Sequence, residues 1–163
     1  MAKTTETNPA QTYEAYMRKQ LDDVKPPTNL ASGEWIFRCA GATSKPNDDY
    51  DPEDANGYLF GINFALVPVE PYANVDLDLV ADGSWRGKRH FKSVYVRGDA
   101  EVDEAKKIIA GFGVNTEGRD LADGLELVKN RTAIVSVGLR TFKNKRTGET
   151  EQANTYANFR PVA

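Results

Sequence analysis

Two stretches of the chain combine several cations with aromatic side chains and contain no acidic residue. Residues 84–98 and 129–146 together hold eleven of the 21 lysines and arginines, in a chain whose formal net charge is −3. Lysine and arginine neutralise phosphate groups, and aromatic rings stack on nucleic-acid bases. The cations that we select as phosphate ligands are Arg86, Lys88, Arg89, Lys92, Arg140, Lys143, Lys145 and Arg146. Two such stretches in an otherwise acidic chain favour phosphate binding over a merely solvated surface.

The aromatic residues divide into core candidates and stacking candidates. Phe60, Phe64 and Phe112 recur with apolar neighbours at strand or helix spacing, which indicates the core. Trp85 lies in a polar turn beside Arg86, so it is the best candidate for an exposed stacking ring. Four further rings alternate with polar residues and are weaker stacking candidates, namely Phe91, Tyr95, Phe142 and Tyr156.

Other chemistries find little support in the residues. Cys39 and His90 are the single cysteine and the single histidine, so neither a disulfide nor a Cys/His zinc site is expected. The acidic stretch 48–54 lacks the spacing of a calcium-binding EF-hand loop, which favours a solvated loop or one that competes with phosphate for the cations. A nuclease that uses Asp76 and Asp78 is the weakest alternative, because no lysine or histidine stands beside them. We therefore expect no metal, no cofactor and no catalytic residue, and a protein that is not an enzyme.

The elements that would position these residues are mainly strands. Apolar and polar residues alternate, or apolar residues run together, in five segments that we interpret as strands: 33–42, 58–69, 88–96, 131–142 and 151–159. Gly41 would allow a bulge near the end of the first strand, and Pro68 and Pro71 are expected to end the second.

Helical spacing occurs in three places. It is clear over 100–112, which the glycines at 111 and 113 end, and weaker over 119–128. Residues 12–24 form a short amphipathic pattern that Pro26 and Pro27 terminate. That segment is interpreted as a helix packed on the body, with a partner-binding or subunit-binding arm as the alternative.

The order of three strands, a helix and two strands is that of the OB-fold, a five-stranded Greek-key barrel with its helix between strands three and four. We therefore expect a mainly β protein in which residues 1–30 are a tail with a short N-terminal helix and residues 31–163 are an OB-fold nucleic-acid-binding domain. Both cationic stretches then fall where an OB-fold binds oligonucleotides, on strand three and on the loop between strands four and five. A five-stranded meander with a helix remains an alternative.

A pattern in the last third of the chain extends this expectation. A helix ends at Leu127 and Val128, a strand with Val135 and Val137 follows, and beyond a basic turn Asn154, Tyr156, Phe159 and Pro161 have the spacing N-x-Y-x-x-F-x-P. Together with Gly87, Arg89 and Phe91, this pattern resembles the OB-fold single-stranded DNA-binding proteins encoded by bacteriophages. The resemblance covers roughly residues 33–161.

The resemblance implies a protein that coats and protects single-stranded DNA in phage replication or recombination with little sequence specificity. Its expected partners are single-stranded DNA, with RNA as a second candidate, together with replication or recombination proteins and further copies of the chain. The competing interpretation is a non-enzymatic protein-interaction or structural adaptor module of a phage replisome or virion. No segment approaches the roughly 18 apolar residues of a membrane span, and residues 1–10 lack the apolar core of a signal peptide. We expect a cytoplasmic location, in the host cell if the protein is viral, and no membrane association.

Overall fold

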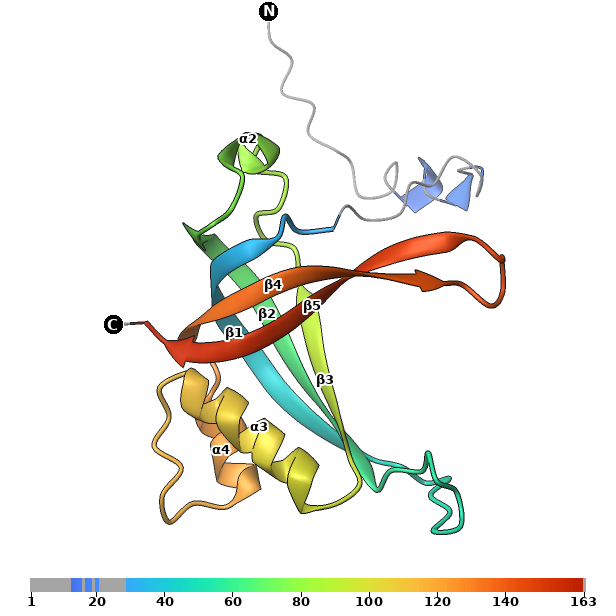
Figure 1. Ribbon diagram of the computed structural model, residues 1–163, viewed down its shortest axis with the longest axis vertical. Coiled ribbons are helices and arrows are strands. Elements are labelled where there is room, and N and C mark those ends of the chain that lie inside the picture. The colour runs from blue at the N-terminus through green and yellow to red at the C-terminus, as the bar shows by residue number, and fades with distance from the viewer. Residues whose placement is uncertain (1–12, 16, 19, 21–28, 163) are drawn as a thin grey trace, which may run out of the picture.

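Five antiparallel strands of alternating burial make up the body of the protein. The computed structural model describes residues 13–15, 17–18, 20 and 29–162. The strands are β1 (Gly33–Pro46), β2 (Phe60–Ala73), β3 (His90–Val96), β4 (Thr132–Lys143) and β5 (Thr150–Pro161). They form one sheet in the order β3-β2-β1-β4-β5, in which β4 and β5 cross over β2 and β3 at a steep angle (Figure 1).

The core lies on the inner face of this strongly curled sheet. Every second residue is buried from Trp35 to Cys39 in β1 and from Ile62 to Pro68 in β2, because successive side chains of a strand point to opposite faces. The largest fully buried side chains come from four strands, from one helix and from the C-terminal ends of two helices, and are Trp35, Phe37, Phe64, Phe112, Ile62, Leu66, Ile109, Val96, Val128 and Val135. Burial of these apolar surfaces supplies most of the driving force for folding.

The pairing of β1 with β2 shifts register beside Gly41 of β1 and beside the two prolines of β2. The register shifts between Cys39 and Gly41, which confirms the bulge predicted for the first strand. The expectation that Pro68 and Pro71 end the second strand was wrong, since β2 continues to Ala73. Proline cannot donate a ladder hydrogen bond, and the two register shifts beside these prolines leave Val69 and Tyr72 without a partner residue on β1.

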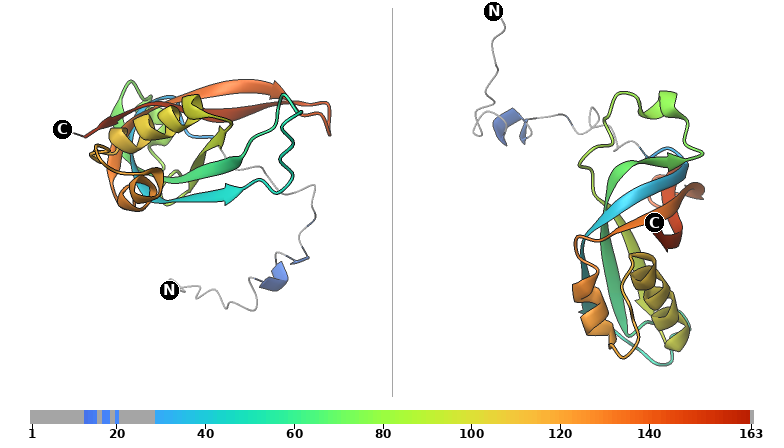
Figure 2. Two further views of the ribbon diagram at one scale, coloured as in Figure 1. Left: turned by 90° about the horizontal axis from the view of Figure 1, so that it is seen from below. Right: turned by 90° about the vertical axis from the view of Figure 1, so that its left-hand side faces the viewer.

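Helices lie at both ends of the sheet, two together at one end and a short one at the other (Figure 1). They are α2 (Leu77–Val80), α3 (Asp99–Gly111) and α4 (Leu121–Leu127), and Figure 2 shows α3 and α4 side by side below the strands. A Cβ atom added to Gly111 would lie 2.5 Å from Phe159 Cβ and 2.6 Å from its carbonyl oxygen. The absence of a side chain at Gly111 therefore allows α3 to lie directly on the backbone of β5.

The edge strands β3 and β5 face each other across an open seam. Within the described residues no ladder joins them, so the sheet is not closed. His90 Nδ1 and the Tyr156 hydroxyl lie 2.7 Å apart and form the hydrogen bond that links the two strands. Helix α3 contacts both β3 and β5 beside this bond.

Most predicted elements agree with the structure, with boundaries that differ by a few residues. All five strands are present, and the predicted helices over 100–112 and 119–128 correspond to α3 and α4. The short helix α2 was not predicted. The N-terminal helix over 12–24 lies largely outside the described residues, and the domain boundary at residue 30 stays a prediction. Among the described helices, none is both long and apolar enough to cross a membrane.

Candidate nucleic-acid interface

The outward face of β3 carries two exposed aromatic rings. Val94 and Val96 point inward and are buried, so Phe91 and Tyr95 point outward, where 53% and 55% of their surface is exposed. Their partner residues on β2 are small, because Phe91 pairs with Ala65 and Tyr95 pairs with Gly61. The Tyr95 ring lies 3.6 Å from the position that a Cβ of Gly61 would occupy. The small residues on β2 thus leave one face of the sheet open beside both rings.

Polar groups and a third ring complete this face. Between the two exposed rings, the Ser93 hydroxyl donates a hydrogen bond to Asn63 Oδ1 at 3.1 Å. The half-buried Tyr58 ring lies 4.9 Å from the Tyr95 ring, centroid to centroid, which restricts the orientation of Tyr95. We call the surface formed by Phe91, Ser93, Tyr95, Asn63 and Tyr58 the aromatic face.

The hairpin between β4 and β5 projects beyond the body as a basic arm. The exposed side chains of Lys143, Lys145 and Arg146 lie at or near its turn, which is closed by a hydrogen bond of 2.9 Å from Asn144 N to Glu149 O. Gly148 adopts a φ of 73°, a conformation that favours glycine. Closer to the body, the Arg140 guanidinium lies 5.4 Å from the centre of the half-buried Phe142 ring. Four of the predicted phosphate ligands therefore share one exposed hairpin.

The loop between β1 and β2, residues 47–59, projects in the same general direction as an acidic arm. Asp51 and Asp54 accept hydrogen bonds from backbone N–H groups two residues further on, which shapes successive turns. Arg97 donates to the Ala55 carbonyl and Asn56 carbonyl at 3.3 and 3.5 Å. One cation of the first basic stretch thus supports the acidic arm.

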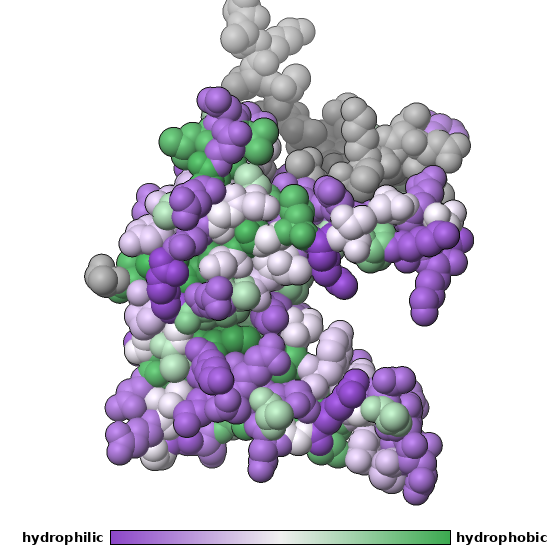
Figure 3. Space-filling model, in the orientation of Figure 1, coloured by the Kyte–Doolittle hydropathy of each residue, from purple (hydrophilic) through white to green (hydrophobic). Residues whose placement is uncertain are grey.

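The two arms flank a hollow in the molecular surface. Figure 3 shows this hollow between the hairpin and the 47–59 loop, and β3 runs along its inner end from beneath the hairpin to the base of the loop (Figure 1). The seam bond between His90 and Tyr156 holds the start of β3 against β5, the second strand of the hairpin. The hollow is basic on one side and acidic on the other.

The expectation that Trp85 is an exposed stacking ring was wrong. Its side chain is only 8% exposed, and its indole N–H donates a hydrogen bond of 3.0 Å to the Val80 carbonyl. The ring packs edge-on against Trp35 at 5.1 Å, while the Arg86 guanidinium lies over it at 4.7 Å. Helix α2, which the sequence did not reveal, folds the polar turn back over the core and encloses the indole.

Two other residues that were predicted to contact nucleic acid also point away from the aromatic face. Tyr156 is 9% exposed, packs against Phe37 and bonds His90, so it belongs to the interior and the seam. Lys92 alternates with the outward Phe91, is half-buried and lies 3.6 Å from Glu104 of α3. Tyr156 is too enclosed to stack on a base, and Lys92 points away from the aromatic face toward Glu104. Arg86, Lys88 and Arg89 are exposed in the turn that leads into β3. Lys88 and Arg89 were expected on the strand itself, which begins at His90.

One cation near this surface was not selected from the sequence. Arg38 lies on the outward face of β1, opposite Val67 of β2, and its guanidinium donates to Asn130 Oδ1 at 3.3 Å. Its position between the buried residues Phe37 and Cys39 is the pattern that could have identified it, because it must then point outward. Arg38 extends the polar outer surface of the sheet from β2 onto β1.

No family model matches this chain, and no curated protein is significantly similar to it. The exposed rings and cations of this surface therefore indicate what kind of ligand it can bind. Exposed rings bind flat apolar faces, and mobile cations beside them bind anions. Among biological polymers, single-stranded nucleic acid presents both kinds of group in alternation.

The His90 contact across the seam predicts a defined pH dependence. Burial, and secondarily the charge of Lys88, lower the pKa of His90 below its usual value of 6.5, whereas burial raises the pKa of Tyr156 to about 12. As the pH falls below 6.5, the unfolded chain takes up a proton that the folded protein resists, so the free energy of unfolding decreases until the pH reaches the folded pKa. Because the chain contains one histidine, its NMR titration is unambiguous and should show a midpoint below 6.5.

The control for this prediction is the His90→Gln variant, whose melting temperature should change less than that of the wild type between pH 7 and pH 5. Equal changes in both proteins, or a midpoint at 6.5 or above, would show that the imidazole is not shielded at the seam.

Proposed function

We propose that this protein binds single-stranded DNA across the aromatic face, with the basic arm holding the phosphates. The observation that carries the proposal is the pair of exposed rings, Phe91 and Tyr95, which stand on a strand at the edge of a hollow bordered by a cationic hairpin. Stacking on aromatic rings stabilises single-strand complexes by roughly 1 to 3 kcal/mol per base and requires no particular sequence.

The fold that we propose is a partly open OB-type barrel. Three features support it: β1 pairs with both β2 and β4, all neighbouring strands are antiparallel, and α3 lies between β3 and β4 in the chain. The helix also covers the gap between β3 and β5, where a closed barrel would have a further ladder. In such a fold the loops between strands one and two and between strands four and five flank the binding surface, as the acidic and basic arms do here.

The cations would hold the phosphates in two groups, one on the hairpin and one in the turn before β3. Lys143, Lys145 and Arg146 would contact phosphates at one side, and Arg86, Lys88 and Arg89 would contact them at the start of β3. These contacts release counterions without reading the bases, so little sequence specificity is expected. The acidic arm would repel the phosphate backbone and keep it toward the basic side of the hollow. A role in coating DNA during phage replication or recombination follows from the sequence resemblance alone.

The proposal is tested by the anisotropy of fluorescein-labelled oligo(dT) titrated with the protein at several salt concentrations. Binding should weaken linearly on a double-logarithmic plot as salt increases. Unlabelled oligo(U) and duplex DNA serve as competitors that separate single-stranded DNA from RNA and from double strands. No binding at low salt would overturn the proposal.

Replacing Lys143, Lys145 and Arg146 together by serine should weaken binding and flatten its salt dependence. A single strand loses about 0.7 units of salt slope for each phosphate contact removed, so the slope should fall by up to about 2. The melting temperature should hardly change, because all three side chains are exposed on the arm. The matched control is the Lys106→Ser and Lys107→Ser pair on α3, which removes exposed cations away from the aromatic face. An unchanged slope in the hairpin variant would mean that the arm does not contact phosphates.

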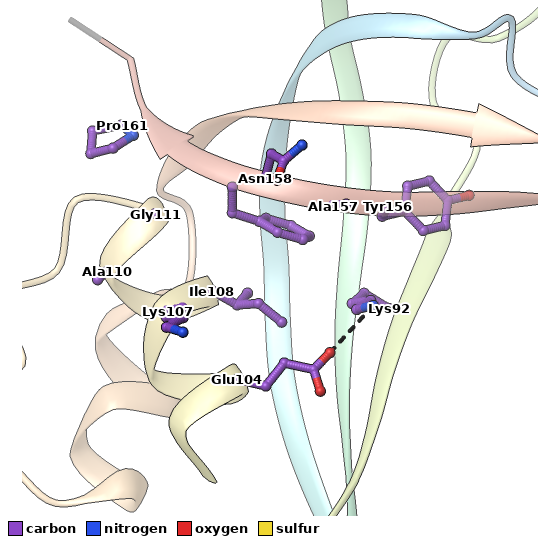
Figure 4. A pocket seen from close by; sticks show the side chains of 11 residues that line it. Lys92, Glu104, Lys107, Ile108, Ala110, Gly111, Tyr156, Ala157, Asn158 and Pro161 are labelled. Carbon is purple, nitrogen blue, oxygen red and sulfur yellow. Dashed lines mark ion pairs between the residues drawn. The ribbon is translucent and has the colours of Figure 1, made fainter. Parts of the chain in front are cut away.

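A groove along the seam supports a second candidate function, that of a protein-interaction adaptor. It has a volume of about 540 Å³ and lies between α3 and β5, where Ile108, Tyr156, Phe159 and Pro161 line it (Figure 4). The Lys92–Glu104 ion pair spans one side of it. Ala157 lines the same groove and is exposed, so an Ala157→Asp variant that keeps oligonucleotide affinity but loses a protein partner would support the adaptor. A wild-type protein that binds neither oligonucleotides nor any replication protein tested would leave the adaptor without support.

A further inference from the structure

The outer surface of the sheet continues without a barrier from the aromatic face onto β1. Ala65 of β2 lies opposite Phe91 on one side and opposite Gly41 of β1 on the other. In the next outward row, Asn63 lies opposite Thr43, which is exposed. Residues that pair across a ladder point to the same face, so these side chains share the outer surface. We call Asn63, Ala65, Gly41 and Thr43 the β1–β2 strip.

The strip is open and carries no acidic residue. A Cβ atom added to Gly41 would meet no atom within 4 Å, so nothing stands above the strip at that point. The chain has 24 aspartates and glutamates, yet none lies in the parts of the three strands concerned, residues 35–47, 60–69 and 90–96. Glu70 is the first acid beyond the strip on β2. A phosphate backbone can therefore cross from β3 to β1 without meeting a like charge on the strip.

Cations collect where the outer surface of β1 reaches the connection between α4 and β4. Arg38 lies opposite Thr132, the first residue of β4, and its guanidinium donates to Asn130 Oδ1 at 3.3 Å. Lys129 and Arg131 stand on either side of Asn130 in the chain, and both are exposed. The acidic arm leaves β1 at its other end, so these three cations lie away from the arm that repels phosphate.

A hollow beside these cations has room for an anion. Its volume is about 500 Å³, and among the described residues that line it, which include Lys129, Arg131 and Thr132, there is no acid. Arg131 also donates to the Gly113 carbonyl at 3.3 Å. A guanidinium has five N–H donors, so single bonds orient Arg38 and Arg131 and leave further donors for a phosphate.

We propose that a bound single strand passes from the aromatic face over the β1–β2 strip to Arg38, and that Lys129 and Arg131 hold the phosphates beyond it. This inference rests on the proposed function, because the exposed rings fix the place from which the strand continues. It assigns to the protein a second set of phosphate ligands, separate from the basic arm.

The position of the two sets predicts a dependence on strand length. The basic arm follows the end of β4, whereas Lys129 and Arg131 precede its start, and β4 is 12 residues long. At 3.3 Å per residue the two ends are roughly 35 Å apart along the strand. A short oligonucleotide on the aromatic face cannot reach both sets, so the second set should affect the binding of long strands alone.

Titrating the Arg38→Gln, Lys129→Ser double variant with labelled oligo(dT) of two lengths tests the path. Single-strand sites on OB-type folds take about 4 to 16 nucleotides, so strands of about 4 and about 16 are compared. For the long strand the salt slope should fall by about 1.4, which is about 0.7 for each lost phosphate contact, while the short strand should bind as it does to the wild type. The Lys106→Ser, Lys107→Ser pair is the control and should match the wild type at both lengths. Wild-type slopes at both lengths, or equal losses at both, would overturn the path.

A variant that adds a charge keeps the test decisive if the double variant folds poorly. Thr132→Lys places a cation on the exposed start of β4 and should raise the long-strand slope by about 0.7. Ser44→Lys is its matched control, because Ser44 is exposed on β1 but pairs with the buried Ile62 and so points to the other face. Equal changes in these two proteins would contradict the path.

Failure of the path and failure of the proposed function give different results. A wild-type protein that binds neither length at low salt would refute both. If the basic-arm variant loses salt slope while the Arg38→Gln, Lys129→Ser variant behaves as the wild type with both strands, the proposed function stands and the path alone is wrong.

Discussion

Replacing Phe91 and Tyr95 together by alanine is expected to weaken oligo(dT) binding by about 30-fold or more at constant salt. Each ring that stacks on a base contributes roughly 1 to 3 kcal/mol, so loss of both should cost about 2 to 6 kcal/mol of binding free energy. Both rings are more than half exposed, which means that the free energy of unfolding should change little. Anisotropy titrations of labelled oligo(dT) measure the effect.

The salt dependence distinguishes this variant from the hairpin variant. Alanine at Phe91 and Tyr95 removes no charge, so the affinity should fall while the salt slope stays that of the wild type. Tyr72→Ala is the matched control, since Tyr72 is 53% exposed on the same sheet but lies beyond the last β2 residue that pairs with β3. Wild-type affinity in the double variant would show that the outward face of β3 is not where bases bind, and the proposed interface would fail.

Phe64→Ala should destabilise the fold by about 3 to 5 kcal/mol, the range for removing a buried phenyl ring. Phe64 is fully buried at the centre of β2, opposite Ala42 on one side and Lys92 on the other. The cost combines lost apolar burial with the cavity that the rigid sheet leaves behind. Urea denaturation followed by far-ultraviolet circular dichroism measures it.

Leu59→Ala provides the control for this measurement, because Leu59 is 43% exposed just before the same strand. Its free energy of unfolding should differ from the wild type by less than about 1 kcal/mol. A Phe64→Ala protein that is no less stable than Leu59→Ala would mean that the inner face of the sheet is not a close-packed core.

Local periodicity was sufficient to predict the strands of this protein, and contacts distant in sequence explain where the prediction failed. The alternation is strong where one face of the strand is buried, which is from Trp35 to Cys39 in β1 and from Ile62 to Pro68 in β2. Pro68 and Pro71 could be accommodated because register shifts beside them are a property of the pairing with β1, which the sequence of β2 alone does not contain. Helix α2 has four residues, too few for a helical period to be recognised.

The same distinction explains why only part of the candidate site was predicted: alternation within a strand can be recognised in the sequence, but contacts with distant segments cannot. The outward positions of Phe91 and Tyr95 follow from alternation along β3, which also places Lys92 on the opposite face. Lys92 was selected as a phosphate ligand because the cations were counted over the whole stretch without regard to the face of the strand on which each lies. The Glu104 partner of Lys92 comes from α3, and the carbonyls bound by Arg97 come from the 47–59 loop. Trp85 was misassigned because its burial depends on Trp35, which lies fifty residues earlier in the chain.

The edge-on packing of Trp35 against Trp85 also gives the protein an internal optical reporter. Two indoles whose ring centres are 5.1 Å apart, at an interplanar angle of 71°, are close enough for their excited states to couple. Such coupling should produce a paired positive and negative band in the dichroism spectrum that vanishes when either tryptophan is replaced by phenylalanine. Since both rings are enclosed at the α2 end, the paired band reports whether the turn that carries Trp85 stays packed against Trp35 of β1. The band should not depend on nucleic acid bound at the aromatic face.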